Sequence, residues 1–122
     1  MGSRFKIGER TIGVYDKKTK TLRKRVFWSK HLFKIGREWG IDYAMLAQLP
    51  EDATIVLEEM ENRRWYWLTK KEIEEKGREF IGYSGYGLQR LVKVEDWHTL
   101  TSEQDEENEY RKSQGLELKY LP

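Results

Sequence analysis

The residues of this chain whose types and spacing could do chemistry are the cations of its N-terminal part. The first forty residues contain twelve Lys and Arg against three Asp and Glu, a local balance of +9, although the whole 122-residue chain has a formal net charge of only +2. Clustered Lys and Arg side chains suit phosphate oxygens, as point charges or as bidentate contacts. We expect six cations to contact nucleic acid without strong sequence preference, namely Lys17, Lys18, Lys20, Arg23, Lys24 and Arg25.

A β-hairpin over residues 11–28 must position these cations. Two apolar runs flank a polar turn at 16–20, as in a hairpin. Alternation places Arg23 and Arg25 on one face of the second strand and Leu22 on the other. The cations would then form either a phosphate-binding face or a solvated face that protects an edge strand from aggregation.

The acidic remainder of the chain suggests other uses of the same charge. A self-associating or protein-binding module is the second hypothesis, in which the basic hairpin of one subunit meets the acidic tail of another. A metal-dependent nuclease is the third hypothesis, with carboxylates at Asp52 and Glu61. Glu61 falls in an expected turn, however, and Arg63 stands at the position where such a site usually has Lys. We expect a non-enzymatic accessory protein with no catalytic residue, no metal site and no cofactor.

Residues 35–49 carry the spacing of a helix-turn-helix, with Gly40 at the turn. The expected second helix at 43–49 has no Lys or Arg to contact phosphates or guanine, so a loop followed by a core helix is the favoured interpretation. The aromatic run Trp65, Tyr66 and Trp67 could stack nucleic-acid bases, but alternation buries at least one of its faces in a chain of this size.

The remaining pattern predicts an α+β fold in which an antiparallel sheet of two β-hairpins and a further strand carries short packed helices. The second hairpin covers 53–68 and the further strand 88–94, after a glycine-rich loop at 82–87. Short helices are predicted at 43–49, capped by Asp42, and at 70–76. The second of these helices begins with a capping box formed by Thr69 and Glu72.

The chain is divided by its pattern into a domain at 1–98 and a charged C-terminal extension at 99–122. Ser102 and Asp105 stand in capping-box spacing, and acids precede bases in the order that suits a helix dipole. Only Tyr110 is apolar on this predicted helix, so we expect a mobile or partner-dependent helix that has almost nothing to bury.

Composition narrows the class of protein further. The absence of cysteine excludes a disulfide framework, a thiolate metal site and a Cys nucleophile, and it fits the reducing cytoplasm. Charged residues at 36% together with aromatic residues at 13% predict an ordered, soluble chain with a thermophile-like composition. No signal peptide, spanning helix or membrane partner is expected.

Single residues spread over roughly positions 12–97 form a pattern that is shared with a group of other proteins. Its members are Ser29, Lys30, His31, Leu32, Trp39, Gly40, Ile41, Asp42, Leu49, residues 65–68, Gly77, Gly87, Gln89 and Trp97. On these residues the chain resembles small uncharacterised proteins of prokaryotic phages, plasmids and genomes, a family of unknown function. The resemblance implies a loop at 32–42 and supplies no activity, ligand or catalytic residue.

Overall fold

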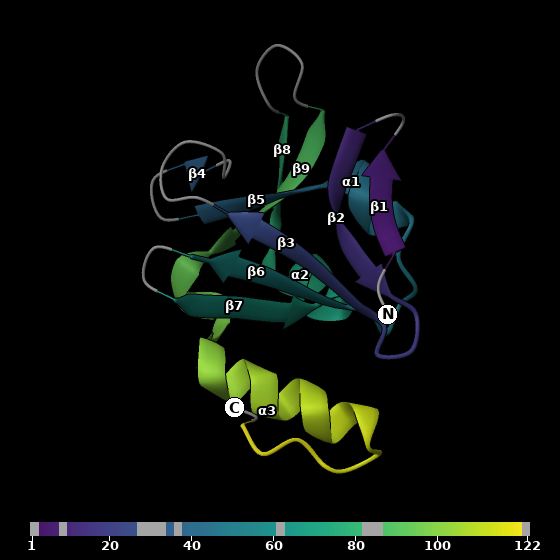
Figure 1. Cartoon of the computed structure of the whole chain (residues 1–122). Helices are drawn as coiled ribbons and strands as arrows, with labels where there is room; N and C mark the ends of the chain where they lie inside the picture. The colour runs from purple at the N-terminus through teal and green to yellow at the C-terminus, as the bar shows by residue number, and fades with distance from the viewer. Residues whose placement is uncertain are drawn as a thin grey trace.

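The computed structural model describes residues 3–7, 10–26, 34–35, 38–60, 63–81 and 87–120. The strands of this part form two sheets, and α-helices lie beside them (Figure 1). The α+β class predicted from the sequence is confirmed.

The larger sheet has six strands in the order β1-β2-β3-β6-β7-β10. Neighbouring strands are antiparallel except β3 and β6, which run parallel and join the two predicted hairpins into one sheet. Both hairpins are confirmed, with Phe27 and Trp28 lying outside the described residues. The strands are β1 (Ser3–Ile7), β2 (Arg10–Asp16), β3 (Thr21–Val26), β6 (Thr54–Glu59), β7 (Arg64–Thr69) and β10 (His98–Thr101).

The turn between β2 and β3 is closed by Asp16. Its Oδ1 accepts hydrogen bonds from the backbone N–H groups of Lys18 at 2.9 Å and Thr19 at 3.4 Å. Burial alone would raise the pKa of Asp16, but these backbone donors outweigh it and hold the pKa below its usual value. Lys20 completes the turn with a φ of 55°, and the three lysines of the turn are exposed.

The smaller sheet has four antiparallel strands in the order β4-β5-β9-β8. The helix-turn-helix interpretation is wrong, because β5 runs as a strand through Gly40 and buries Trp39 and Ile41 by strand alternation. The loop implied by the resemblance at 32–42 is likewise a strand from Glu38 to Asp42. The strands are β4 (Lys34–Ile35), β5 (Glu38–Asp42), β8 (Arg78–Ile81) and β9 (Leu88–Lys93).

Two predicted helices are confirmed. Helix α1 (Tyr43–Ala47) starts where the Asp42 side chain accepts the Ala44 N–H at 2.7 Å. Helix α2 (Lys70–Lys76) starts at the predicted capping box, and Glu72 and Thr69 exchange both hydrogen bonds.

The main hydrophobic core lies between the two sheets and is closed by α1 and α2. It takes alternate residues of β3, β6 and β7 from the larger sheet and of β5 and β9 from the smaller one. After β9 the chain passes through the 3-10 turn η1 (Val94–Asp96) to Trp97, which is buried in this core. We call the face of the larger sheet that carries Leu22, Ile55 and Leu68 the inner face, and the opposite face, which carries Arg23, Val56 and Trp65, the outer face.

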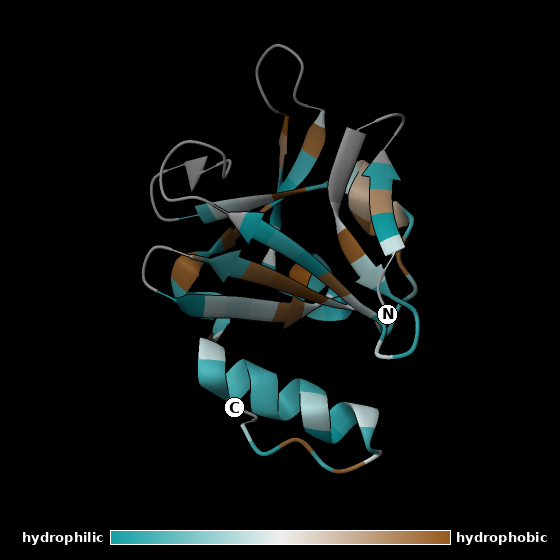
Figure 2. Cartoon of the chain, in the orientation of Figure 1, coloured by the Kyte–Doolittle hydropathy of each residue, from teal (hydrophilic) through white to brown (hydrophobic). Residues whose placement is uncertain are grey.

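Helix α3 (Ser102–Ser113) lies against the larger sheet, where it contacts β7 and β10 (Figure 1). Figure 2 shows that α3 is almost wholly hydrophilic, in contrast to the strands of the core. Its capping box is formed by Thr101 and Gln104, one residue earlier than predicted, because the strand β10 ends at Thr101. The expectation that α3 has almost nothing to bury is wrong, since it buries Ser102, Asp105 and Asn108.

Candidate nucleic-acid interface

The six predicted contact residues divide into three groups in the structure. Lys17 and Lys18 of the β2–β3 turn and Arg25 on β3 are exposed. Lys20 is exposed but bonded, and Lys24 is half-buried on the side of the strand that carries Leu22. Arg23 forms ion pairs with carboxylates of the chain itself, whereas the sequence predicted that it would contact nucleic acid.

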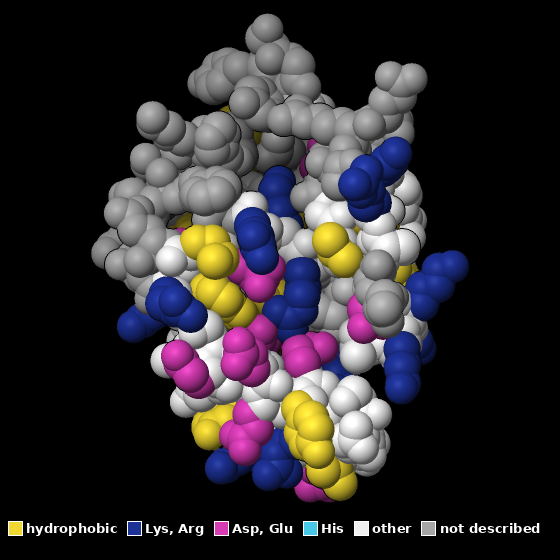
Figure 3. Space-filling view, in the orientation of Figure 1, with side chains coloured by type: hydrophobic (Ala, Val, Ile, Leu, Met, Phe, Trp, Pro, Cys, Tyr) yellow, Lys and Arg dark blue, Asp and Glu magenta, His cyan; other side chains and the backbone are white. Residues whose placement is uncertain are grey.

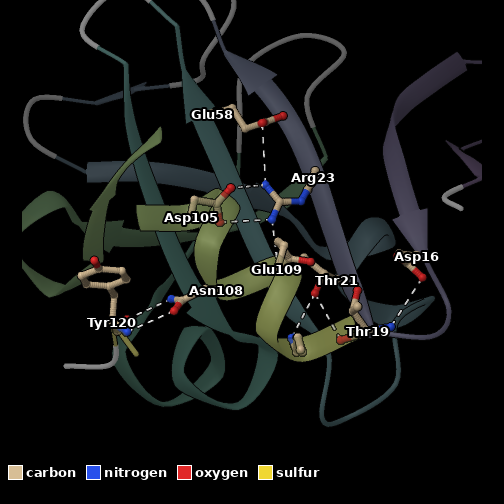
Figure 4. A network of polar contacts seen from close by, with 10 residues as sticks. Asp16, Thr19, Thr21, Arg23, Glu58, Asp105, Asn108, Glu109 and Tyr120 are labelled. Atoms are coloured by element: carbon tan, nitrogen blue, oxygen red, sulfur yellow. Dashed lines mark hydrogen bonds and ion pairs between the residues drawn. The ribbon is translucent and has the colours of Figure 1, made fainter. Parts of the chain in front are cut away.

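Arg23 is surrounded by three carboxylates, two from α3 and one from β6 (Figure 4). Its Nη1 donates to Asp105 Oδ2 at 2.6 Å and its Nη2 to Asp105 Oδ1 at 3.1 Å, a bidentate pair. Nη2 also lies 2.9 Å from Glu109 Oε1, and Nη1 lies 3.7 Å from Glu58 Oε2. We call these four residues the Arg23 network.

The charge of Arg23 is therefore neutralised inside the chain. Burial alone would lower the pKa of Arg23, but the hydrogen bond and negative charge of Asp105, with Glu109 and Glu58, outweigh it and raise that pKa above its usual value. The Asp105 side chain is only 7% exposed and that of Arg23 22% exposed, so solvent screens the pair weakly. While α3 is in place, both Nη groups of Arg23 are occupied by internal carboxylates.

Lys20 has a partner of a different kind. Its Nζ lies 2.6 Å from Asp52 Oδ2, and both side chains are more than half exposed. The hydrogen bond between them raises the pKa of Lys20 and lowers that of Asp52. A pair so open to water is weak, and an external anion can compete for the lysine.

Within the basic N-terminal segment, the described cations that remain available lie on β1, on the β2–β3 turn and on β3. Arg4 and Lys6 of β1 are exposed and stand beside the predicted hairpin, because β1 pairs with β2. Sequence analysis missed them because β1 itself was not predicted, although they belong to the same +9 segment. Among the described residues, no ion pair is formed by Arg4, Lys6, Lys17, Lys18 or Arg25.

The outer face of the larger sheet brings cations and aromatic rings into the same rows. Paired residues on neighbouring strands point to the same side of a sheet, so the register defines each row. One row crosses all six strands as Arg4, Val14, Arg23, Val56, Trp67 and His98. The next row contains Arg25, Glu58, Trp65 and Leu100.

The aromatic end of these rows is covered. Trp65 is only 7% exposed and forms a second apolar cluster with Val56 and Leu100, against which Trp67 and Tyr120 pack. Alternation of Trp65 and Trp67 against Tyr66 is confirmed, since Tyr66 packs on the core between the sheets. Trp65 is therefore not available for base stacking in this state, and Trp67 is half-buried.

The segment after α3 supplies part of that cover. The Asn108 side chain on α3 accepts hydrogen bonds from the backbone N–H groups of Lys119 at 3.1 Å and Tyr120 at 3.0 Å, and it donates to the Tyr120 carbonyl at 3.1 Å. The bonds between Asn108 and Tyr120 are drawn in Figure 4. They fold the segment back, and Tyr120 packs against the Trp65 cluster. Sequence analysis gave no signal for this contact, because Asn108 is a polar residue in a polar helix.

Of the two histidines, His98 lies in the described part of the chain. His31 lies outside the described residues. His98 Nε2 lies 2.7 Å from Glu72 Oε2, and the His98 ring packs against Trp67 at a centroid distance of 4.5 Å. Burial alone would raise the pKa of Glu72, but the Thr69 backbone donor and His98 together lower it.

The carboxylates named for a nuclease are not brought together by the described part of the chain. Asp52 is bonded to Lys20, and Glu61 lies outside the described residues. No group of three His, Asp or Glu residues with metal-binding geometry occurs among the residues that are described. Within the same residues, none of the helices has the length and apolar character needed to cross a membrane.

Comparison of the chain with protein-family models, with curated proteins and with solved structures finds no match.

Proposed function

We propose that this chain is a small non-enzymatic accessory protein that binds nucleic acid, or a comparable polyanion, through its basic N-terminal strands. The observation that carries the proposal is the set of five exposed cations on β1, the β2–β3 turn and β3 that have no ion-pair partner among the described residues. Of the six cations predicted from the sequence, Lys17, Lys18 and Arg25 are kept, and Arg4 and Lys6 are added to them. Lys20, which pairs with Asp52, the half-buried Lys24, and Arg23, which is held by α3, are not counted.

Charge distribution supports this use of the surface. In Figure 3, Asp and Glu side chains gather in the middle of the molecule, above α3, and further Lys and Arg side chains lie along the right-hand margin. Four acidic side chains are engaged with Arg23 or Lys20, namely Asp52, Glu58, Asp105 and Glu109. The unpaired cations keep a local positive field that attracts an anionic chain.

The contacts are expected to be made to phosphates and to carry no sequence preference. Lys17 and Lys18 lie in a turn and Arg25 on a strand, so no helix presents a row of side chains to a base edge. Phosphate binding of this kind releases counterions and weakens steeply with salt.

Fluorescence anisotropy with a labelled DNA duplex of mixed sequence tests the proposal. Five phosphate contacts predict that affinity falls about 500-fold between roughly 50 and 200 mM salt. The variant Lys17→Glu/Lys18→Glu should lose most of the affinity and reduce the salt slope by about two.

A matched control is Lys71→Glu/Lys93→Glu, which makes the same change in net charge at exposed positions of α2 and β9. It should weaken binding far less than the turn variant. Equal losses in the two variants, or affinity that does not change with salt, would overturn the proposal.

A further inference from the structure

Helix α3 lies on the outer face of the larger sheet, where cationic side chains of β3 and tryptophan rings of β7 share the same rows. Along one row of the sheet, Arg23 is separated from Trp67 only by Val56. In the next row, Arg25 is separated from Trp65 only by Glu58. Sheets that bind single strands combine these elements, a cationic track for the backbone and rings on which bases stack.

The contacts of α3 replace those that such a ligand would make. Asp105 holds Arg23 in the bidentate geometry that a phosphate also takes, and Glu109 one turn later holds the same guanidinium. Asn108 holds the segment that places Tyr120 against the Trp65 cluster. The helix thus holds the cation, and the segment after it packs Tyr120 against the cluster that contains Trp65.

The attachment of α3 differs from that of a core helix. The side chains it buries are polar, and the one apolar residue within its bounds, Tyr110, is 63% exposed. Burial of apolar surface therefore contributes little to its docking, and charge and hydrogen bonds contribute most. A polyanion offers Arg23 the same kind of partner in exchange.

We infer that α3 and residues 114–120 form an internal competitor at a site for single-stranded nucleic acid built from Arg23, Arg25, Trp65 and Trp67, of which Arg25 is already exposed. This inference rests on the proposed function for its class of ligand, and it adds a second surface and its regulation. Displacement of α3 exposes Arg23 to phosphates and the two tryptophans to bases. The exposed cations of the basic strands, which are open at all times, bring the strand to the molecule.

The test uses the full chain with the α3 contacts weakened. Asp105→Asn/Glu109→Gln removes both carboxylate charges that hold Arg23 and keeps the side-chain shapes. Its control, Glu103→Gln/Glu106→Gln, makes the same charge change at exposed positions of α3. Affinities are measured for a labelled oligo(dT), a labelled oligo(U) and a DNA duplex of equal length, so that the DNA and RNA forms of the ligand are distinguished.

The release variant should bind the single strands about tenfold or more tightly than the wild type, because stacking contributes about 1 to 3 kcal/mol per base. Duplex affinity should rise no more than in the control, since paired bases cannot stack on the rings. Binding should also quench tryptophan fluorescence. Equal gains for duplex and single strands, matched by the control, would show an effect of net charge alone and overturn the inference.

A second variant keeps the inference testable if the release variant loses its fold, as seen by circular dichroism. Tyr120→Ala removes the ring that packs against the Trp65 cluster and leaves the net charge unchanged. It should raise affinity for single strands alone, and no rise would overturn the inference. Failure of the proposed function is a separate result, namely wild-type duplex affinity that does not depend on Lys17 and Lys18.

Discussion

The two faces of the larger sheet are covered in opposite ways. The inner face packs Leu22, Ile55 and Leu68 against the smaller sheet and two short helices, and these three side chains are fully buried. The outer face is covered by α3, whose buried side chains are polar and whose closest contacts to β3 are ion pairs. The first cover depends on apolar burial. In the second, α3 is held mainly by charge and hydrogen bonds, and Tyr120 adds an apolar contact after it.

This difference separates the scaffold from the element that can move. Apolar burial responds weakly to salt and to charged ligands, whereas ion pairs respond to both. A polyanion can therefore act on the outer cover without disturbing the inner one.

The largest effect is expected on the inner face. Ile55→Ala removes a fully buried side chain near the start of β6 and should lower the free energy of unfolding by about 2 to 5 kcal/mol. Urea denaturation at low and at high salt measures this loss of stability, which should be similar at both because apolar burial responds weakly to salt. Ile81→Ala is the control, because Ile81 is 78% exposed and should change stability by no more than about 0.5 kcal/mol. Similar losses in the two variants would contradict the placement of the core.

The next effect is expected at the Arg23 network. Arg23→Met leaves the buried Asp105 carboxylate without its counter-charge and should cost about 2 to 3 kcal/mol, somewhat below the value for a fully buried pair. Denaturation followed by far-ultraviolet circular dichroism should show helix lost before the sheet. Arg64→Met, at an exposed position of β7, should be nearly neutral. A neutral Arg23→Met would mean that charge does not hold α3.

Capping provides a smaller and more local comparison. Thr101→Ala and Thr69→Ala each remove one capping box and should cost the helix about 1 kcal/mol. Helix α2 buries Ile73 in the core, so the Thr69 variant should lower the stability of the whole fold. The Thr101 variant should speed amide exchange in α3 alone. If both variants speed amide exchange equally throughout the chain, α3 does not open independently of the core, and the difference between the two covers is contradicted.

The smallest expected effect is a pH dependence at Glu72. Because its pKa is lower in the folded chain than its usual value, ionised Glu72 stabilises the fold above the usual pKa, and this stability is lost as the pH falls through the folded pKa. Glu72→Gln should flatten the acid limb of the stability curve by less than about 1 kcal/mol. Denaturation midpoints between about pH 6 and pH 3 measure it. A steeper acid limb in the variant would contradict the assignment.

Local signals in the sequence predicted the hairpins and the short helices well. The Asp16 turn, the Asp42 cap and the Thr69 capping box all depend on residues that lie close together in the chain. The strand β5 was missed because Gly40 weakens both helix and strand patterns. Its partner strand β9 also lies some fifty residues further along the chain, so no local signal indicates the pairing.

The site was harder to predict for a related reason. Arg23 and Asp105 are 82 positions apart, and a helix that docks through polar side chains has no hydrophobic periodicity to indicate its buried face. The total of +9 in the first forty residues is a property of composition, whereas its availability depends on partners from β6 and α3. Charge counts therefore predicted that a basic surface exists and could not predict which of its cations is covered.

Amide hydrogen exchange of the full chain, resolved by residue, tests the central claim most directly. The account predicts that α3 opens at a lower free energy than β6 and β7, and that raising salt from about 50 to 500 mM speeds exchange in α3 severalfold while the core strands are unchanged. Exchange of α3 only together with the core strands, at a rate that salt does not alter, would contradict a helix held by charge.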